Sequence, residues 1–297
     1  MTSRLSQVVA TARPNFMVLS PLCVLLGIAA AIHQTGSIAP GLTILVLLGG
    51  TLAHAAVNLL NEYEDFRSGL DSITLRTPFS GGSGTLPAHP DAAAATLLAG
   101  VACLVATAGI GLYVAWVRGA GIVPLGLLGL VIVVAYTRWI TRSPLLCLLA
   151  PGVGFGPLMV IGTAYVLTGR YDSIAVLASL VPFFLVSDLL LINQFPDVEA
   201  DRQIGRRHLP IVIGRVASAR IYAAFVLAPF AVIGAGCASG VFPMMAALGL
   251  LALPAAVILA TQVTRRAQDD QALMPMLGLN VAVVLGTILL FALGLML

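Results

Sequence analysis

The chain alternates between long apolar runs and short polar segments. A helix needs about 20 mainly apolar residues to cross a bilayer, and nine runs of roughly this length can be identified. They lie at residues 15–33, 40–60, 91–115, 120–138, 144–168, 173–194, 217–239, 241–262 and 273–297. The pattern predicts an all-α polytopic membrane protein, a single domain over residues 1–297 with about nine transmembrane helices around a central cavity.

Composition agrees with this class, because 59% of the residues are hydrophobic and only 9% are charged. A soluble domain of average usage is far more polar. The first apolar run follows Arg4 and Arg13 and could pass for a signal sequence, but eight further runs favour a retained first helix. The four cysteines lie in apolar runs without paired spacing, so neither a disulfide framework nor a metal cluster is predicted.

The distribution of arginine predicts the orientation. All 15 basic residues are arginine, and with a cytoplasmic N-terminus only Arg118 and Arg170 fall on the external side. By the positive-inside rule the N-terminus is cytoplasmic and the C-terminus is external, in the cell inner membrane. The net charge of +3 then follows from topology and gives no indication of nucleic-acid binding.

Two polar segments follow apolar runs and share one spacing. The first is NEYEDFRSGLD at residues 61–71, and the second is NQFPDVEADRQIGRRHLP at residues 193–210. Residues four apart lie on one helix face, so each segment is expected to present a row of oxygen ligands. The four-residue spacings are Asn61 to Asp65, Asn193 to Asp197, and Asp197 to Asp201.

The two segments follow the second and sixth predicted helices. This placement indicates two four-helix pseudo-repeats plus one helix, which would bring both rows to a common centre. Asn58 and His54 extend the first row into the membrane. They fit a functional role and a role as hydrogen-bonded packing residues equally well.

Two facing rows of carboxylates and amides favour a hard cation such as Mg²⁺, which is usually shared with substrate phosphates. Guanidinium forks recognise phosphate, and Arg67, Arg202 and Arg206 stand close to the acids. The combination predicts a diphosphate site at the cytoplasmic rim. Its position at the mouth of an apolar bundle indicates a diphosphate with a long apolar tail. The candidate metal ligands are Asn61, Glu62, Asp65, Asp71, Asn193, Asp197 and Asp201, with Asp71 beyond the expected helix end at Gly69.

Three further features leave alternatives open. Arg138, Arg142 and Tyr136 reach the same rim from the fourth helix as candidate phosphate or acceptor contacts, or serve as topological anchors. The glycine-rich segment TPFSGGSGTLP, residues 77–87, is either a lid or phosphate-binding nest, or a flexible connector. Asp188 lies inside the sixth span, where an ionisable side chain indicates function by default, but it points away from the metal face and has no assigned role.

The two acidic segments resemble the aspartate-rich motifs of the UbiA superfamily of intramembrane prenyltransferases. ARPNF at residues 12–16 resembles the family's opening Arg-Pro, and GFGPLMVIGTAYVLTG at 154–169 resembles its fifth-helix segment, so the resemblance covers nearly the whole chain. It implies nine helices with the N-terminus inside, and Mg²⁺-assisted ionisation of a polyprenyl diphosphate. The gap from Asp65 to Asp71 and the DRQIGR continuation are most similar to the menaquinone branch, which prenylates 1,4-dihydroxy-2-naphthoate.

Two positions depart from the family pattern. Glu62 stands where an Asp is usual, and RWITRSPLLCLLAP follows AYT in place of a Gly-Leu-Gly-Glu-like stretch. Transfer to a different acceptor within the superfamily is therefore the alternative, and the tail length and oligomeric state stay open.

The resemblance implies an electrophilic substitution. Asp65, Asp197 and Asp201, with Asn61 and Asn193, would hold Mg²⁺ on the diphosphate while an aromatic acceptor attacks the allylic carbon in a pocket that excludes water. The tail is expected to leave through a lateral opening to membrane lipid, with the second and sixth helices facing one cavity.

Two other protein classes stay open as alternatives. A transporter built on an internal repeat should place its site near the midplane, whereas these acids lie at the rim. A CDP-alcohol phosphotransferase would carry its aspartates in one continuous motif, which is absent here.

Overall fold

The computed structural model describes residues 3–77 and 79–297, and this part of the chain is helical with no strand. Pro78, inside the glycine-rich segment, lies outside the described residues. The helices that form the spans keep the order of the predicted apolar runs. They are α3 (Leu19–Thr35), α4 (Pro40–Ser68), α7 (Ala93–Arg118), α8 (Val123–Ala135), α9 (Pro144–Val153), α10 (Gly162–Thr168), α11 (Ser173–Asn193), α14 (Arg215–Ala238), α15 (Leu253–Arg265) and α16 (Asp270–Met296).

The protein is an integral membrane protein. Within the described residues, 8 helical segments are long and apolar enough to span a membrane, and Ala120–Ala135 is a shorter apolar helix. Together they coincide with the nine predicted runs. The helix Ala120–Ala135 is about 24 Å long at 1.5 Å per residue, somewhat less than the hydrocarbon thickness of about 30 Å.

The fifth span changes its winding halfway through. Between α9 and α10 lies the π-helical segment η4 (Gly154–Ile161), a conformation that is rare and frequent at functional sites. A Cβ atom at Gly152 would lie 2.2 Å from Ser187 Oγ, and one at Gly156 would lie 2.4 Å from the Ser179 carbonyl oxygen. These two glycines therefore let the fifth span pack directly against α11.

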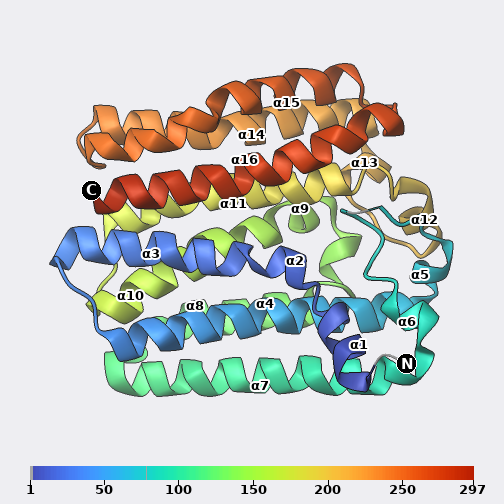
Figure 1. Ribbon diagram of the computed structural model, residues 1–297, viewed down its shortest axis with the longest axis horizontal. Coiled ribbons are helices and arrows are strands. Elements are labelled where there is room, and N and C mark those ends of the chain that lie inside the picture. Colours follow the sequence, from blue (N-terminus) through green and yellow to red (C-terminus); the bar gives the residue numbers. More distant parts are fainter. Residues whose placement is uncertain (1–2, 78) are drawn as a thin grey trace.

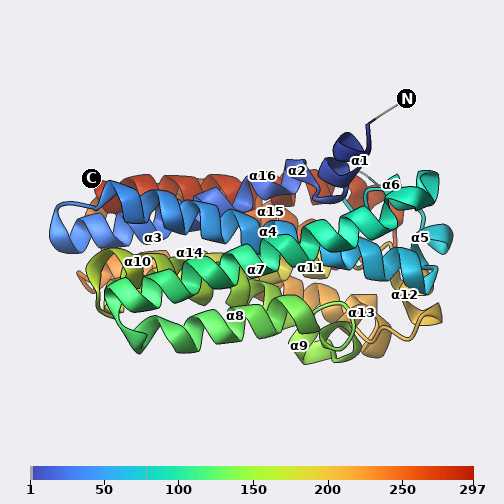
Figure 2. The same ribbon diagram turned by 90° about the horizontal axis from the view of Figure 1, so that it is seen from below.

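The long helices run side by side, and the short ones gather at one end of the bundle (Figures 1 and 2). The described N-terminal residues lie at this end, and the C-terminus lies at the other (Figure 1). Each helix that carries an acidic motif packs against the span that follows it in the chain: α4 packs on α7, and α11 packs on α14. The predicted pseudo-repeat requires such matching pairs. The short helices at this end are α1 (Arg4–Thr11), α5 (Leu70–Ile73), α6 (Thr85–Ala88), α12 (Val198–Gln203) and α13 (Leu209–Val212), and the short α2 (Pro14–Met17) leads from α1 into α3.

The two acidic motifs end their helices differently. Helix α4 continues to Ser68 and stops at Gly69, whose φ of 81° is the left-handed conformation favoured by glycine. This confirms the predicted helix end before Asp71. Helix α11 stops at Asn193, and α12 begins only at Val198. The prediction that the second motif forms one helical row is wrong at this point, because Pro196 disfavours a helical residue before it and supplies no backbone N–H.

Candidate active site

A single guanidinium joins the two acidic motifs. Arg206 pairs with Asp65 near the end of α4 through Nη2, and its Nη1 lies 2.9 Å from Asp201 Oδ1 on α12. The second oxygen of Asp201 lies 3.0 Å from Nε2 of His208. All these groups are largely buried, and a buried charge is stable only when it is paired. The expected meeting of the two motifs at one centre is therefore present in the structure.

Other oxygens at this centre have no protein partner. Asp71 Oδ2, Asn193 Oδ1 and Asp197 Oδ1 are buried and accept no hydrogen bond within the described part of the chain. Burial and repulsion from neighbouring carboxylates raise the pKa of Asp71 to about 7. The same two causes raise the pKa of Asp197 to about 7. Buried polar groups normally have partners, so these oxygens are suited to a cation or to the donors of a ligand.

These oxygens fit a hard cation, although the described residues contain no ready-made cage of three His, Cys, Asp or Glu side chains. Mg²⁺ does not require such a cage, because it usually takes one or two carboxylates and completes its shell with water and substrate phosphate. The oxygens without partners, on Asp71, Asn193 and Asp197, are of the ligand type that Mg²⁺ prefers. Asp65 and Asp201 lie beside them, with their charge already shared with Arg206.

The membrane-side residues of the first row have protein partners. The Asn61 amide donates to Thr137 Oγ1 at 3.1 Å, and the Asn58 amide donates to the Ala12 carbonyl oxygen at 2.9 Å. His54 Nδ1 lies 2.7 Å from the Ser20 hydroxyl oxygen. These contacts account for the predicted packing role of His54 and Asn58. The three residues also line the central cavity.

Glu62 differs from Asp71 and Asp197 because both of its oxygens have protein partners, as those of Asp201 also do. The Glu62 side chain is fully buried. Oε1 accepts from Arg13 Nε and from the Ser83 backbone N–H, each at 2.7 Å. Oε2 accepts from the Ser83 hydroxyl at 2.6 Å. The residue predicted as a metal ligand is thus part of a network between the N-terminal segment and the glycine-rich segment.

Of the arginines singled out in the sequence, only Arg206 enters this centre. Arg202 is exposed beside Glu199, at 3.4 Å, and the Arg138 guanidinium lies 5.9 Å from the Trp139 ring centroid. Tyr136 lies near Asp65 and Arg206. The predicted phosphate contacts whose side chains are exposed are Arg67, Arg138, Arg142 and Arg202.

Sequence reasoning did not assign Arg13, Ser83 or His208 to the site. Among the described residues, Arg13 is the only non-glycine residue with positive φ, at 54°, a conformation that costs roughly 1–2 kcal/mol. Its ion pair with Glu62 holds it there. The available signal for Arg13 was the Arg-Pro pair in ARPNF, and Ser83 lies in the glycine-rich segment 77–87 that the sequence offers as a lid, a phosphate-binding nest or a connector. Nothing in the spacing of the motifs indicated His208.

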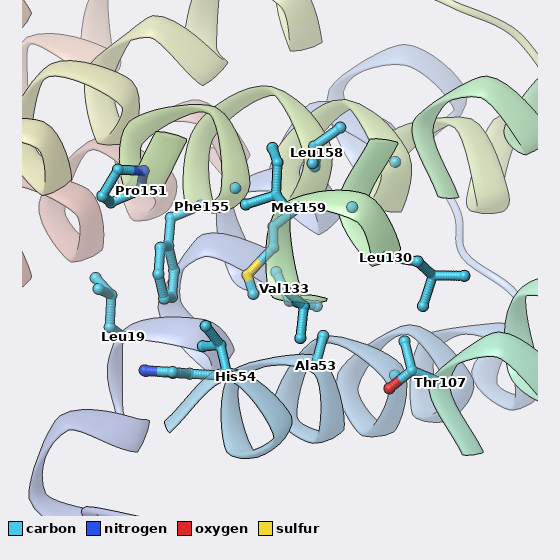
Figure 3. A pocket seen from close by; sticks show the side chains of 18 of the residues that line it. Leu19, Ala53, His54, Thr107, Leu130, Val133, Pro151, Phe155, Leu158 and Met159 are labelled. Carbon is cyan, nitrogen blue, oxygen red and sulfur yellow. The ribbon is translucent and has the colours of Figure 1, made fainter. Parts of the chain in front are cut away.

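A largely apolar cavity of about 650 Å³ opens beside the acidic centre. Asn61, Tyr136 and Asn193 line its site end, and Val114 and Val166 line its far end. Figure 3 shows the middle of the cavity, with His54 and Phe155 close to one another and Met159 beside them. Side chains of α4 and α11 both contribute to the wall, as predicted for the second and sixth helices.

Asp188 lies apart from this cavity. It is fully buried, and its Oδ1 accepts from the Asn280 amide at 3.4 Å. Asn280 in turn accepts from the Tyr222 hydroxyl at 3.1 Å. These contacts connect α11, α14 and α16, so the geometry favours a packing role for Asp188.

The chain is similar in sequence and in fold to known prenyltransferases. Residues 20–282 match the profile of the UbiA prenyltransferase family. The 1,4-dihydroxy-2-naphthoate octaprenyltransferase of Escherichia coli (strain K12) is 28% identical, over 96% of this chain and 93% of its own length. The enzyme of the same description from Bacillus subtilis (strain 168) is also 28% identical, over 75% of this chain and 71% of its own. A UbiA homolog from Archaeoglobus fulgidus, solved with DMAPP and Mg²⁺, shares the fold with a TM-score of 0.66 at 12% identity, covering 96% of this chain and 99% of that one.

Proposed function

Because the chain belongs to the UbiA prenyltransferase family, we propose that it transfers a polyprenyl group from its diphosphate to an aromatic acceptor, with Mg²⁺ as cofactor. The observation that carries this proposal is the meeting of two acidic motifs at the mouth of an apolar cavity. A substrate with a charged head and a long apolar tail matches both parts. The acids and Arg206 face the head, and the cavity between α4 and α11 accommodates the tail.

The tail gains free energy by leaving water, roughly 25 cal/mol for each Å² of apolar surface. The cavity extends from Asn61 to residues near the opposite membrane face, such as Val114 and Val166. Its walls consist mainly of aliphatic side chains and glycine. A tail longer than the cavity would leave through a lateral opening between helices into lipid, as the sequence predicts.

The head of the substrate would lie between the two motifs. Asp71, Asn193 and Asp197 supply oxygens that have no protein partner, and Asp65 and Asp201 stand beside them. When bound there, Mg²⁺ would neutralise charge on the diphosphate as the allylic C–O bond breaks. Arg206 can add hydrogen bonds to phosphate, since it already lies between the motifs, and the apolar cavity limits access of water to the allylic carbon.

The acceptor we propose is 1,4-dihydroxy-2-naphthoate, within the biosynthesis of a menaquinone-like lipoquinone. Support comes from the two relatives that cover most of this chain. In this reaction a ring carbon attacks the allylic carbon, and diphosphate leaves with the electrons of the C–O bond. The arginine distribution supports a cytoplasmic N-terminus and active site in the inner membrane.

The decisive experiment combines purified protein, one polyprenyl diphosphate and a panel of aromatic acids, with products identified by mass spectrometry. We expect prenylated naphthoate in the presence of Mg²⁺ and none when EDTA removes the metal. Transfer only to another aromatic acid would change the acceptor but keep the reaction class. Failure to release diphosphate with any acceptor would contradict the enzyme assignment.

A further inference from the structure

The glycine-rich segment crosses both acidic motifs and is attached to the first by one buried carboxylate. We propose that Glu62 is a positioning residue that fastens residues 79–84 across the mouth of the cavity, instead of the metal ligand that the sequence predicts. The inference rests on the proposed prenyl transfer, because its function is to keep water from the allylic carbon.

The contacts of Glu62 leave little room for a metal. A carboxylate offers about four acceptor positions, and three are used by Arg13 Nε, the Ser83 N–H and the Ser83 hydroxyl. The Arg13 Nη2 group lies 2.5 Å from the same oxygen as its Nε, so the pair is charge-assisted. Asp71 and Asp197, by contrast, each keep an oxygen without a partner. A metal at Glu62 would have to displace protein donors, whereas one at the two aspartates would not.

The backbone of the segment lies directly on the carboxylates. A Cβ atom at Gly82 would stand 3.0 Å from Asp71 Oδ1 and 3.3 Å from Glu62 Oε1, and the φ of Gly82 is 76°. Both the space and the conformation therefore favour glycine. Ser80 interacts with the Asp197 carboxylate and counteracts the rise of its pKa. The segment thus contacts the first motif through Gly82 and Ser83 and the second through Ser80.

The segment also stands between two pockets of different character. Phe79 lines the apolar cavity of about 650 Å³ and also a second pocket of about 530 Å³. That second pocket includes Ser6, Thr77, Ser80 and Ser83. Phe79 reaches α16 as well, with Cζ 3.4 Å from the position of a Cβ at Gly278. Fastening the segment therefore keeps a phenyl ring between the second, more polar pocket and the apolar cavity.

Loosening this attachment has a defined chemical consequence. Water would reach the allylic carbon, form a C–O bond there and displace diphosphate, and a proton would pass to solvent. The product is a prenyl alcohol in place of the prenylated acceptor. The proportion of alcohol among the products therefore measures how well the segment is held.

The test uses three variants of the attachment and one control on the same helix. Glu62→Ala removes every contact, Glu62→Gln can still accept from Arg13 and the Ser83 N–H while donating to the Ser83 hydroxyl, and Ser83→Ala removes one contact. Glu64→Ala removes an acid for which no ion pair or hydrogen bond is seen within residues 3–77 and 79–297. Each variant is assayed for product identity, for the Mg²⁺ concentration at half-maximal rate, and for tryptic cleavage after Arg76, with the exposed Arg265 as reference site.

Loss of a hydrogen bond to a charged acceptor changes the equilibrium constant between the attached and the detached segment by roughly ten- to a hundredfold. We therefore expect Ser83→Ala to raise the alcohol fraction about tenfold and to speed cleavage after Arg76. Glu62→Ala should have a larger effect, and Glu62→Gln should recover most of the transfer. The half-maximal Mg²⁺ concentration should stay within about twofold of wild type for the Gln and Ser83 variants. Glu64→Ala should match wild type throughout.

Two results would overturn the positioning role. One is a large increase in the Mg²⁺ requirement of Glu62→Gln with an unchanged alcohol fraction, which would make Glu62 a metal ligand. The other is an unchanged alcohol fraction and cleavage rate in folded Ser83→Ala and Glu62→Gln. If Glu62→Ala does not fold, these two milder variants decide the question. Absence of any Mg²⁺-dependent transfer by the wild-type protein would instead reject the proposed function.

Discussion

The two halves of the acidic centre are built on different backbones. The first half lies on one continuous helix, α4, and turns sharply at Gly69. The second half lies across a break between α11 and α12, at residues 194–197. In the first half Glu62 has protein partners on both oxygens and Asp65 is paired with Arg206, and Asp71, beyond the turn at Gly69, keeps one oxygen without a partner. In the second, Asn193 and Asp197 each keep a buried oxygen without a partner.

This contrast suggests a division of labour. A continuous helix holds its side chains in fixed positions, so the first half can fasten the segment above it. A helix break exposes main-chain and side-chain groups that the helix would otherwise satisfy. The open oxygens therefore lie at the break in the second half and beyond the turn at Gly69 in the first, and we expect them to face a metal and its diphosphate. Variants in the two halves are expected to fail in different ways.

The largest expected effect is that of Asp197→Asn. Loss of one charged ligand should lower the rate at least a hundredfold, because the amide is a much poorer partner for Mg²⁺ than the carboxylate. Without Mg²⁺, the Asp197→Asn variant should be at least as stable as the wild-type protein at pH 8. The folded-state pKa of about 7 is raised above the ordinary 3.8, so ionisation of Asp197 disfavours the folded state as pH rises through this interval.

Activity at saturating Mg²⁺ and thermal unfolding without Mg²⁺ measure these two quantities. Glu199→Gln is the matched control, because Glu199 lies on the same segment but is exposed beside Arg202. Wild-type turnover in Asp197→Asn, with the same Mg²⁺ dependence, would show that the open oxygen of the second half does not bind metal.

The next effect concerns the bridge between the halves. Arg206→Lys keeps the charge but cannot direct two parallel donors to Asp65 and Asp201. Breaking a buried ion pair typically costs about 3–5 kcal/mol when one partner is removed, and we expect the Lys variant to lose a smaller amount, about 1–2 kcal/mol. Diphosphate binding should weaken as well, because the same guanidinium faces the site.

Arg202→Lys provides the control for this variant. The Arg202 and Glu199 pair is largely exposed, and such pairs contribute about 0–1 kcal/mol. Thermal unfolding and binding of inorganic diphosphate should both stay at wild-type values. An equal loss in the two variants would mean that Arg206 contributes charge alone and does not join the motifs by geometry.

The contrast between the halves also shows what a sequence can reveal. The membrane spans, the helix end at Gly69 and the meeting of the two motifs were predictable, because apolar length and repeated spacing depend on local pattern. The break at Pro196 was readable from the same segment, yet the four-residue spacing suggested a continuous row. The roles of Glu62 and the arginines were not predictable, since they depend on contacts such as Glu62 with Ser83 that join distant parts of the chain.

The smallest expected effect tests the turn in the first half. Gly69→Ala adds a Cβ that meets no atom within 4 Å, so its cost comes only from the left-handed backbone conformation, about 1 kcal/mol. Relief of this strain would shift the turn that leads to Asp71, and the Mg²⁺ requirement should rise a few fold. Gly109→Ala is the control, because that glycine also has open space but lies inside α7, where alanine is at least as favourable. Equal behaviour of the two variants, measured by half-maximal Mg²⁺ and thermal unfolding, would show that the placement of Asp71 does not depend on the turn at Gly69. The first half of the site would then owe its geometry to α4 and the glycine-rich segment alone.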